Sequence, residues 1–383
     1  MKIAYILPSF SGDFEKPNGG VESAAINLVR GILEADNDVK MFLLFPNTNQ
    51  IIANIPKGLT VVPIYSRFKK IWTFNYPLIG INRFIEKEIL KIDPDIIHVQ
   101  AAPGFYRNFD KIKTFLTLHG VPYIDSRFNR RLANKFKSYI TKQIFLRDTK
   151  RYKNLIFLVN YSYSLLKPNL NKSINVFFIP NPIVNCTPKI LHGRNEIPVL
   201  FFSGILRPIK NIEGLILASY YLKNEGLNFQ LQFAGNFFSK AYEVKIKSLI
   251  SKYGLEDNIE FLGQLSSNEV QETIHKIDVN LLPSFQEVCP MSIIEAMVFG
   301  KPSIASSIGG IPELIFNNYN GYLIPVGNAE ELANKIKFIL EPEIYNAMSN
   351  HCLDMSEIYY YLNIANRTLD CYHVSLKGPQ RSF

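Results

Sequence analysis

Cysteine is scarce in this sequence, and no hydrophobic run is long enough to cross a membrane. The four cysteines among 383 residues, Cys186, Cys289, Cys352 and Cys371, show neither the close spacing of a metal site nor a disulfide framework. No apolar run reaches the ~18 residues that a transmembrane helix needs. Residues 1–8 carry one charge and no small-residue cleavage site, so they predict a buried strand and not a signal peptide. We therefore expect a globular protein of a reducing cytoplasm.

Several common catalytic and nucleotide-binding motifs are also missing. The sequence has no Gly-x-Gly-x-x-Gly and no Gly-x-x-x-x-Gly-Lys-Ser/Thr, which counts against an ordinary dehydrogenase and a P-loop nucleotidase. It has no Gly-x-Ser-x-Gly and no His-Glu-x-x-His either. Two Asp-x-Asp pairs, at 36–38 and 93–95, precede predicted strands, where turns form, and Pro94 favours a turn. We therefore predict no metal site.

Positive charge is concentrated in the first half of the chain. Residues 1–185 hold 26 Lys and Arg against 13 Asp and Glu, whereas the remainder holds 16 against 20. The excess is greatest at 127–153, where ten basic residues and several aromatic residues accompany one acid, Asp148. Such a segment can bind nucleic acid, an anionic membrane surface or an acidic substrate, or it can form a solvated helix face.

Apolar runs of strand length alternate with segments of helical period along the whole chain. This alternation predicts an α/β fold with parallel sheets, and the length of 383 residues fits two domains. The pattern runs from a strand at 3–7 to one at 176–179, and a polar, proline-containing linker follows at 180–198. It restarts with a strand at 199–203, and helical spacing returns at about 356–374.

The segment Ser284–Pro302 predicts a loop followed by one short helix. Pro290 suits the first helical position, where its missing N–H is not needed, and Gly300 ends the helix. Glu287 therefore lies in the loop and Glu295 inside the helix. The free N–H groups of a helix start attract phosphate, and an ionised carboxylate can accept both hydroxyls of a diol. A nucleotide sugar carries a diol on each side of a diphosphate, so it suits this arrangement; two solvated surface acids are the alternative.

Four motifs together carry a family resemblance. They are Glu287-x7-Glu295, the Glu-Ala-Met-x-x-Gly-Lys-Pro that begins at Glu295, Ile308-Gly-Gly-Ile-Pro-Glu313, and Asn320-Gly-Tyr-Leu-Ile-Pro325. In this order they resemble the retaining glycosyltransferase family 4 of the two-domain GT-B type. The resemblance runs from about residue 2 to about residue 340 and is densest in the second half.

The resemblance implies two facing Rossmann-like domains with a cleft between them. Residues 1–185 would form the acceptor domain, rejoined by a C-terminal helix at about 356–376, and residues 186–355 would bind the nucleotide sugar. The family implies transfer of a hexose or N-acetylhexosamine from a nucleoside-diphosphate sugar, with UDP favoured and GDP possible. The acceptor would be a glycan or lipid-linked molecule, in bacterial surface polysaccharide synthesis (lipopolysaccharide, capsule or O-antigen).

The resemblance also assigns residues in the second domain. Glu287 would orient the hydroxyls of the transferred sugar and Glu295 would bind the ribose. Backbone groups of Met291, Ser292 and Ile293 would hold the diphosphate.

A loop after the first strand of the second domain supplies positive charge. Lys210 matches the family pattern Gly-Arg-Leu-x-x-x-Lys that begins at Gly204, but Ile205 stands at the usual arginine position. We expect Arg207 to supply that charge from two residues later. Fixed cations stabilise the charge that grows on a departing diphosphate, so no metal cofactor is expected. Gly235, in the next loop, is expected beside the donor.

Two features of the first domain match the family as well. Gly19 and Gly20 stand between a first strand and an amphipathic helix, where the family's Gly-Gly loop lies under the donor diphosphate. His119 follows a predicted strand and matches the histidine that contacts the transferred sugar. Two loop glycines and a lone histidine can also be purely structural, and His98 is a weaker candidate of the same kind.

The sequence leaves other readings open. Ile205 suggests a nucleotide-sugar-binding protein with weak or no turnover. The basic first half suggests a nucleic-acid binder, but that function leaves the paired glutamates unexplained, so we expect no nucleic acid. The segment 127–153 is our candidate for contact with an anionic membrane, which would make the protein cytoplasmic or peripheral on the inner face of the plasma membrane.

Overall fold

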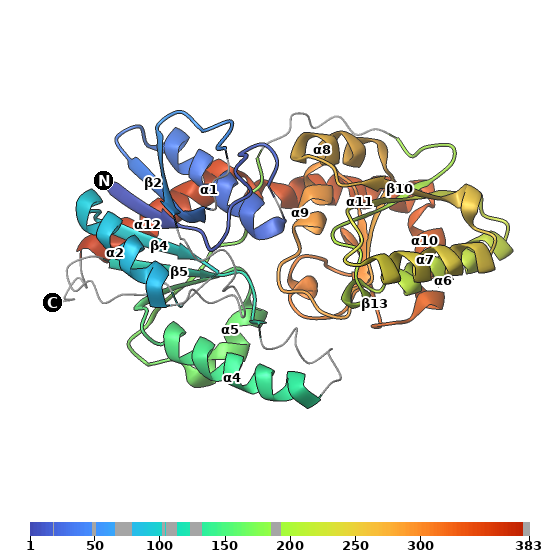
Figure 1. The fold of residues 1–383 in the computed structure, drawn as a ribbon. Coiled ribbons are helices and arrows are strands. Elements are labelled where there is room, and N and C mark those ends of the chain that lie inside the picture. The colour runs from blue at the N-terminus through green and yellow to red at the C-terminus, as the bar shows by residue number, and fades with distance from the viewer. Residues whose placement is uncertain are drawn as a thin grey trace. The chain divides into compact units, whose positions relative to one another are not determined.

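The chain folds into two compact units. The computed structural model describes residues 1–17, 19–47, 51–65, 79–101, 104, 113–122, 132–184 and 193–377. One unit comprises Met1–Val184 together with Tyr359–Phe383, and the other comprises Asn185–Ile358 (Figure 1). The sequence prediction divided the chain at 185/186 and returned it to the first unit at about residue 356.

Within the described residues, the first unit contains one seven-stranded parallel sheet in the order β3-β2-β1-β4-β5-β6-β7. The sheet reverses its direction of winding between β1 and β4, where α/β sheets place ligand crevices at the carboxyl ends of the strands. The strands are β1 Lys2–Ile6, β2 Lys40–Asn47, β3 Leu59–Tyr65, β4 Ile96–Gln100, β5 Lys113–Leu118, β6 Asn154–Phe157 and β7 Asn175–Phe178. The helices include α1 Gly20–Ala35, α2 Ile79–Ile92, α4 Leu132–Thr149, α5 Asn160–Leu166 and α12 Tyr361–Lys377.

The second unit repeats this architecture. Its described strands form a six-stranded parallel sheet in the order β10-β9-β8-β11-β12-β13, with the winding reversed between β8 and β11. The strands are β8 Val199–Ser203, β9 Gln230–Ala234, β10 Ile259–Gly263, β11 Val279–Leu282, β12 Ser303–Ser306 and β13 Gly321–Ile324. The helices include α6 Ile212–Asn224, α7 Lys240–Lys252, α8 Ser267–Lys276, α9 Met291–Val298, α10 Ala329–Ile339 and α11 Pro342–Ser356. The prediction of an α/β fold with parallel sheets is confirmed.

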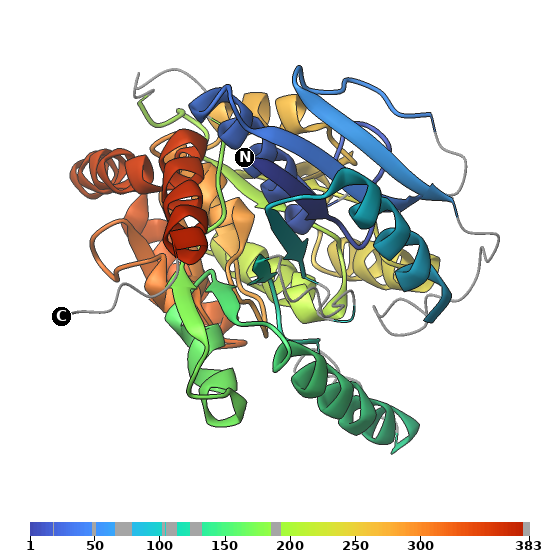
Figure 2. The ribbon, with the colours of Figure 1, turned by 90° about the vertical axis from the view of Figure 1, so that its left-hand side faces the viewer.

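The last helix, α12, completes the core of the first unit. It packs on α1, so a helix near the end of the sequence lies beside a helix near its beginning (Figure 1 and Figure 2). Four of its residues, Ile364, Ala365, Leu369 and Tyr372, are buried in one cluster with side chains of β1, β2 and α1. The two helices approach closely because α1 has Gly31 at the crossing: a Cβ there would lie 2.7 Å from the Tyr361 carbonyl oxygen.

Two details differ from the sequence prediction. Pro290 is the N-cap of α9, with extended backbone (φ −69°, ψ 122°), so the helix begins one residue later than predicted, at Met291. The helix α11 was not predicted, because the side chains that it buries include Ser349, Cys352 and Ser356, which weaken the apolar stripe.

Candidate functional site

In the second unit, two loops at the carboxyl ends of the sheet strands meet and bring opposite charges together. Lys210 ends a short 3-10 helix after β8, and Glu287 lies in the loop between β11 and α9. The Phe285 N–H donates to the Ile209 carbonyl at 2.8 Å, which joins the two loops. Lys210 Nζ forms an ion pair with Glu287 Oε1, and these side chains are only 17% and 11% exposed.

The backbone around this pair is held by close packing. Asn211, the N-cap of α6, adopts a left-handed conformation (φ 55°), and its side chain accepts from the Gly214 N–H, which fixes the turn that follows Lys210. Gly309 packs directly beneath the Glu287 backbone: a Cβ there would lie 1.9 Å from the Glu287 carbonyl oxygen. The Ile308-Gly-Gly segment therefore supports the loop that carries the carboxylate.

Two predicted glycines form adjoining turns at the carboxyl ends of β8 and β9. Gly204 follows β8 and Gly235 follows β9, and the Gly204 N–H donates to the Ala234 carbonyl at 2.9 Å. Gly235 has a φ of +134°, and a Cβ there would lie 2.1 Å from the Gly204 carbonyl oxygen. Any side chain at this position would push the two loops apart, so their close contact requires a glycine there.

The cations predicted in the Gly204–Lys210 loop differ in their surroundings. Arg207 is exposed, and no ion pair or hydrogen bond of its side chain occurs among the described residues. Ile205, which stands at the family's arginine position, is 53% exposed and carries no charge. Lys210 is therefore committed to Glu287 in this structure, whereas the Arg207 guanidinium is available to a ligand.

The helix α9 begins directly after the Glu287 loop and carries a carboxyl group of unusual pKa. Met291 and Ile293 are buried and Ser292 is half-buried. No side chain of the described residues caps the helix start, and the Ile293 N–H donates to the Pro290 carbonyl at 3.3 Å. Glu295 lies in the middle of this helix and is half-buried as a whole residue. Desolvation of its carboxyl group raises the pKa to about 7.

In the first unit, Gly19 and Gly20 lie at the start of α1. Gly19 is the N-cap, with a φ of 103°, and its carbonyl accepts from the Ser23 N–H at 3.1 Å. The preceding loop is tied to the helix by Glu22, whose Oε1 accepts from the Ser11 N–H at 2.8 Å and from Ser11 Oγ at 2.5 Å. Glu22 is only 5% exposed. The sequence prediction missed this carboxylate, although it lies two residues beyond Gly20.

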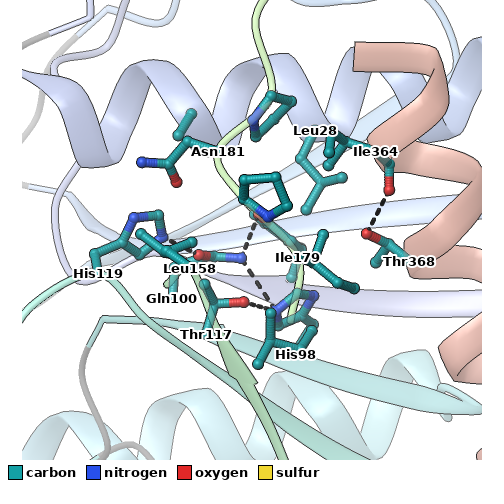
Figure 3. A pocket seen from close by; sticks show the side chains of 15 residues that line it. Leu28, His98, Gln100, Thr117, His119, Leu158, Ile179, Asn181, Ile364 and Thr368 are labelled. Atoms are coloured by element: carbon teal, nitrogen blue, oxygen red, sulfur yellow. Dashed lines mark hydrogen bonds between the residues drawn. The ribbon is translucent and has the colours of Figure 1, made fainter. Parts of the chain in front are cut away.

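His119 lies just beyond β5 and belongs to a buried network of polar side chains. Its Nε2 lies 2.5 Å from Gln100 Oε1, and Gln100 Nε2 lies 2.5 Å from Tyr5 Oη and 3.1 Å from His98 Nε2 (Figure 3). Burial lowers the pKa of His119 to about 4, so its imidazole is neutral at neutral pH. Burial, followed by the nearby His119, lowers the pKa of His98 to about 3.

The remaining bonds of His98 mark it as structural. Its Nδ1 lies 2.5 Å from Tyr372 Oη of α12, and its Nε2 lies 2.7 Å from Thr117 Oγ1. His98 is fully buried. Gln100 was missed by the sequence prediction; the signal for it was the two-residue spacing from His98 on β4, which puts both side chains on one face of the sheet.

The basic segment 127–153 is described in part. Residues 127–131 lie outside the described residues, and α4 covers most of the rest. Arg147 and Arg151 approach the buried Asp148, with N–O distances of 2.9 and 3.7 Å, so two of the ten basic residues serve the fold. Tyr139 of α4 is 61% exposed.

The residues that the structure describes contain neither a candidate metal site nor a candidate membrane span. No group of three or more His, Cys, Asp or Glu side chains in those parts of the chain could hold a metal ion. Over the same ranges, no helix is long and apolar enough to cross a membrane.

Comparison with known proteins covers both units. The model of the family described as "Glycosyltransferase Family 4" matches residues 18–184, and that described as "Glycosyl transferases group 1" matches residues 188–357. An uncharacterized glycosyltransferase of Methanocaldococcus jannaschii is 27% identical over 336 residues, 85% of this chain and 86% of its own. The amylovoran biosynthesis glycosyltransferase AmsK of Erwinia amylovora is 33% identical over 130 residues, about a third of each chain.

Solved structures of the same fold match almost the whole chain. The sucrose-phosphate synthase of Thermosynechococcus elongatus has a TM-score of 0.81 at 18% identity, over 99% of this chain and 100% of its own. The HepE protein of Anabaena, solved in complex with UDP and glucose, has a TM-score of 0.73 at 16% identity, over 97% and 99%. The chain therefore belongs to the group 1, family 4 glycosyltransferases and has their two-domain α/β fold of the GT-B type.

Proposed function

We propose that the protein is a retaining glycosyltransferase that uses a nucleoside-diphosphate sugar. It would transfer a hexose or N-acetylhexosamine to a glycan or lipid-linked acceptor, with UDP as the favoured carrier and GDP as the alternative. The observation that carries the proposal is the withdrawn Lys210–Glu287 pair, whose glutamate lies in the loop that leads into α9. The UDP complex of the HepE protein supports the choice of carrier.

Each part of a nucleotide sugar has a partner of suitable chemistry in the second unit. Lys210 and the free Arg207 guanidinium would contact the diphosphate, with the N–H groups of Met291–Ile293 at the helix start. Glu287 would accept hydroxyls of the sugar, and Glu295 the diol of the ribose. Glu287 and Lys210, which lie in contact, would therefore bind two adjacent parts of the ligand, the sugar and the diphosphate.

The chemistry that we propose keeps the anomeric configuration. The bond between the anomeric carbon and the diphosphate oxygen breaks, and the electron pair leaves with the nucleoside diphosphate. The acceptor hydroxyl oxygen bonds to the same face of that carbon, and its proton passes to the departing phosphate oxygen. Lys210 and Arg207 would stabilise the charge that grows on the leaving group, so the proposal requires no metal cofactor.

A thermal-shift panel of nucleoside diphosphates and their sugars identifies the donor, because a bound ligand raises the melting temperature by mass action. Transfer or donor hydrolysis is then measured for Glu287→Ala and Lys210→Ala. Each lost charge-assisted contact is worth about 1.5–3 kcal/mol, so we expect kcat/KM to fall roughly 10- to 100-fold. Lys337→Ala, which breaks a more exposed ion pair of the same unit, is the control and should leave activity unchanged.

A nucleotide-sugar-binding protein with weak or no turnover is the second candidate, favoured by the exposed Ile205 at the position of the family's arginine. It predicts a thermal shift with a nucleotide sugar but no release of nucleoside diphosphate, with or without acceptor. Turnover that is lost in Lys210→Ala decides for the transferase.

We further propose that the basic segment 127–153 contacts an anionic membrane, which would place the enzyme beside a lipid-linked acceptor in surface polysaccharide synthesis. Lys150 and Lys153 are exposed and can be reversed without disturbing Asp148. Each basic residue near an anionic surface is worth about 1 kcal/mol, so Lys150→Glu with Lys153→Glu should weaken binding to phosphatidylserine vesicles at least ~10-fold. The control variant, Lys252→Glu with Lys276→Glu, reverses two exposed lysines of the second unit and should bind these vesicles as well as the wild type does. Equal binding by the wild type and both variants would contradict the proposal.

A further inference from the structure

We propose that Tyr242 and Glu213, in the first turns of α7 and α6, are positioning residues for the Arg207 guanidinium. The hydrogen bond between them holds the loop that carries Arg207 where it can meet the donor diphosphate. The inference rests on the proposed use of a nucleoside-diphosphate sugar, which supplies the anionic ligand.

The position of the Arg207 side chain depends on how its backbone is held. The side chain is exposed, and no partner among the described residues fixes it. Arg207 has extended backbone (φ −143°, ψ 158°) and is the N-cap of the short 3-10 helix Pro208–Lys210. The residue before it, Leu206, is fully buried. The contacts of Leu206 therefore decide where the arginine side chain starts.

Leu206 is bonded to the loop between β9 and α7. Its N–H donates to the Asn236 carbonyl at 2.9 Å, and its carbonyl accepts from the Phe238 N–H at 3.0 Å. These two bonds form an isolated parallel bridge between Leu206 and Phe237. A shift of that loop would therefore move Leu206, and Arg207 with it.

The ring of Tyr242 supports the same loop from the start of α7. It is 5% exposed, and the rings of Phe237 and Phe238 lie edge-on to it, with centroids 6.4 and 5.9 Å away. Edge-to-face contact is a favourable geometry for aromatic pairs. Ser239 Oγ, at the N-cap of α7, accepts from the Tyr242 N–H at 3.3 Å. Backbone and side chain of Tyr242 therefore both hold the loop.

The hydroxyl of Tyr242 joins this loop to the helix that follows Lys210. Its Oη donates to Glu213 Oε2 at 2.6 Å, across the contact between α7 and α6 (Figure 1). Lys245 Nζ donates to the other oxygen, Glu213 Oε1, at 2.7 Å. The bridge holds the turn with both cations at its beginning, and Glu213 holds the helix at its end. The Tyr242–Glu213 bond fixes these two ends to each other.

Calorimetric titration of the full chain with UDP, or with the nucleoside diphosphate that the thermal panel selects, measures the effect. Tyr242→Phe keeps the ring and removes the hydroxyl, so the loop loses its bond to α6. We expect the affinity to fall about 3- to 10-fold, less than the roughly 10- to 100-fold for Arg207→Ala, because the guanidinium is displaced and not removed. Tyr253→Phe, at the other end of α7, is the control and should leave the affinity unchanged.

A double-variant cycle separates positioning from a general loss of stability. If Tyr242 acts through Arg207, Tyr242→Phe should have little further effect in the Arg207→Ala protein. Equal losses in both backgrounds, or no loss in the wild-type background, overturn the proposal.

Substitutions of Glu213 test whether the hydrogen bond or the charge is responsible. Glu213→Gln keeps an oxygen that can accept from Tyr242 Oη, so it should retain most of the affinity. Glu213→Leu has no acceptor and should lose affinity as Tyr242→Phe does. Equal losses in the two Glu213 variants would assign the effect to the charge and contradict the proposal.

Hydrogen exchange of the free protein provides a measurement that needs no ligand. The amides of Leu206 and Phe238 in the bridge should exchange faster in Tyr242→Phe than in the wild type, while the Phe201 amide of β8 keeps its protection. Unchanged exchange at the bridge overturns the proposal, even if a nucleoside diphosphate binds. A wild type that binds no nucleoside diphosphate would instead defeat the proposed function, and the exchange result would still decide whether the pair holds the loop.

Discussion

At the Lys210–Glu287 pair, each charge satisfies the other while both side chains are largely withdrawn from water. Breaking a withdrawn ion pair by removing one partner is costly, because the remaining charge has nothing to replace the lost contact. A nucleotide sugar offers both replacements at once: an anionic diphosphate for the ammonium and hydroxyl donors for the carboxylate. We therefore expect that a nucleoside diphosphate alone, which replaces only one of them, binds less well than the complete donor.

The ionisation of Glu295 makes the stability of the folded protein depend on pH. Its carboxyl pKa is raised from 4.5 to about 7 by desolvation, so the folded state holds a proton that the unfolded chain has released. This contribution to stability is complete below the unfolded pKa and is lost as the pH rises through about 7. Glu295→Gln cannot ionise, and at pH 8 we expect it to be more stable than the wild type, by on the order of 1–3 kcal/mol.

Calorimetric melting at pH 5 and pH 8 checks this prediction. The gain in melting temperature of Glu295→Gln over the wild type should be larger at pH 8 than at pH 5; a gain that does not depend on pH would contradict it. Glu330→Gln, an exposed substitution in α10, serves as the control. Donor affinity should change in the opposite sense: it should rise with pH through about 7 in the wild type, because the ionised carboxylate accepts the diol, and the variant should lack this rise.

At the scale of elements, sequence periodicity predicted the alternation of strands and helices but not their contacts. It predicted the helix after Glu287, with an error of one residue at Pro290, since a proline suits both the N-cap and the first helical position. Periodicity could not show that Lys210 touches Glu287, because that contact joins two loops 77 residues apart. Nor could it show that the buried Asn181 Oδ1 has no hydrogen-bond partner among the described residues, because that depends on everything packed around it.

The crossing of α1 and α12 leaves little room for a side chain at position 31. An alanine at position 31 would gain helix propensity of about 1 kcal/mol, but its Cβ would meet the Tyr361 carbonyl oxygen at 2.7 Å and the Ala365 Cβ at 2.9 Å. Overpacking usually costs about 1–3 kcal/mol, so Gly31→Ala should destabilise the first unit and Gly31→Val more so. Urea denaturation measures both.

A second substitution at the same crossing tests the cause. Ala365→Gly removes one of the three atoms that the new Cβ would meet most closely. The double variant should therefore be more stable than the sum of the single changes predicts, by at least about 0.5 kcal/mol. Strict additivity would mean that the helices do not limit each other there.

In the whole molecule, the first unit is built from two segments that are separated in the sequence. The last helix lies with the first unit, so the second unit is a continuous segment inserted between two parts of the first. The sequence resemblance implied this return of the chain, but composition and periodicity alone could not, because an amphipathic helix does not specify which sheet it covers.

Removing the C-terminal segment that contains α12 should therefore unfold the first unit, although most of that unit lies at the other end of the sequence. A chain that ends at Ile358 lacks the buried Ile364, Leu369 and Tyr372, each worth about 1.5–3 kcal/mol of burial, against a total stability of about 5–15 kcal/mol. His98 also loses the Tyr372 hydroxyl that bonds to it. Hydrogen exchange should show rapid exchange in β1, β4 and β5 and retained protection in β8 and β11. A chain that ends at Lys377 should match the full-length protein in both units, and continued protection of β1 in the shorter chain would mean that α12 covers the first core without stabilising it.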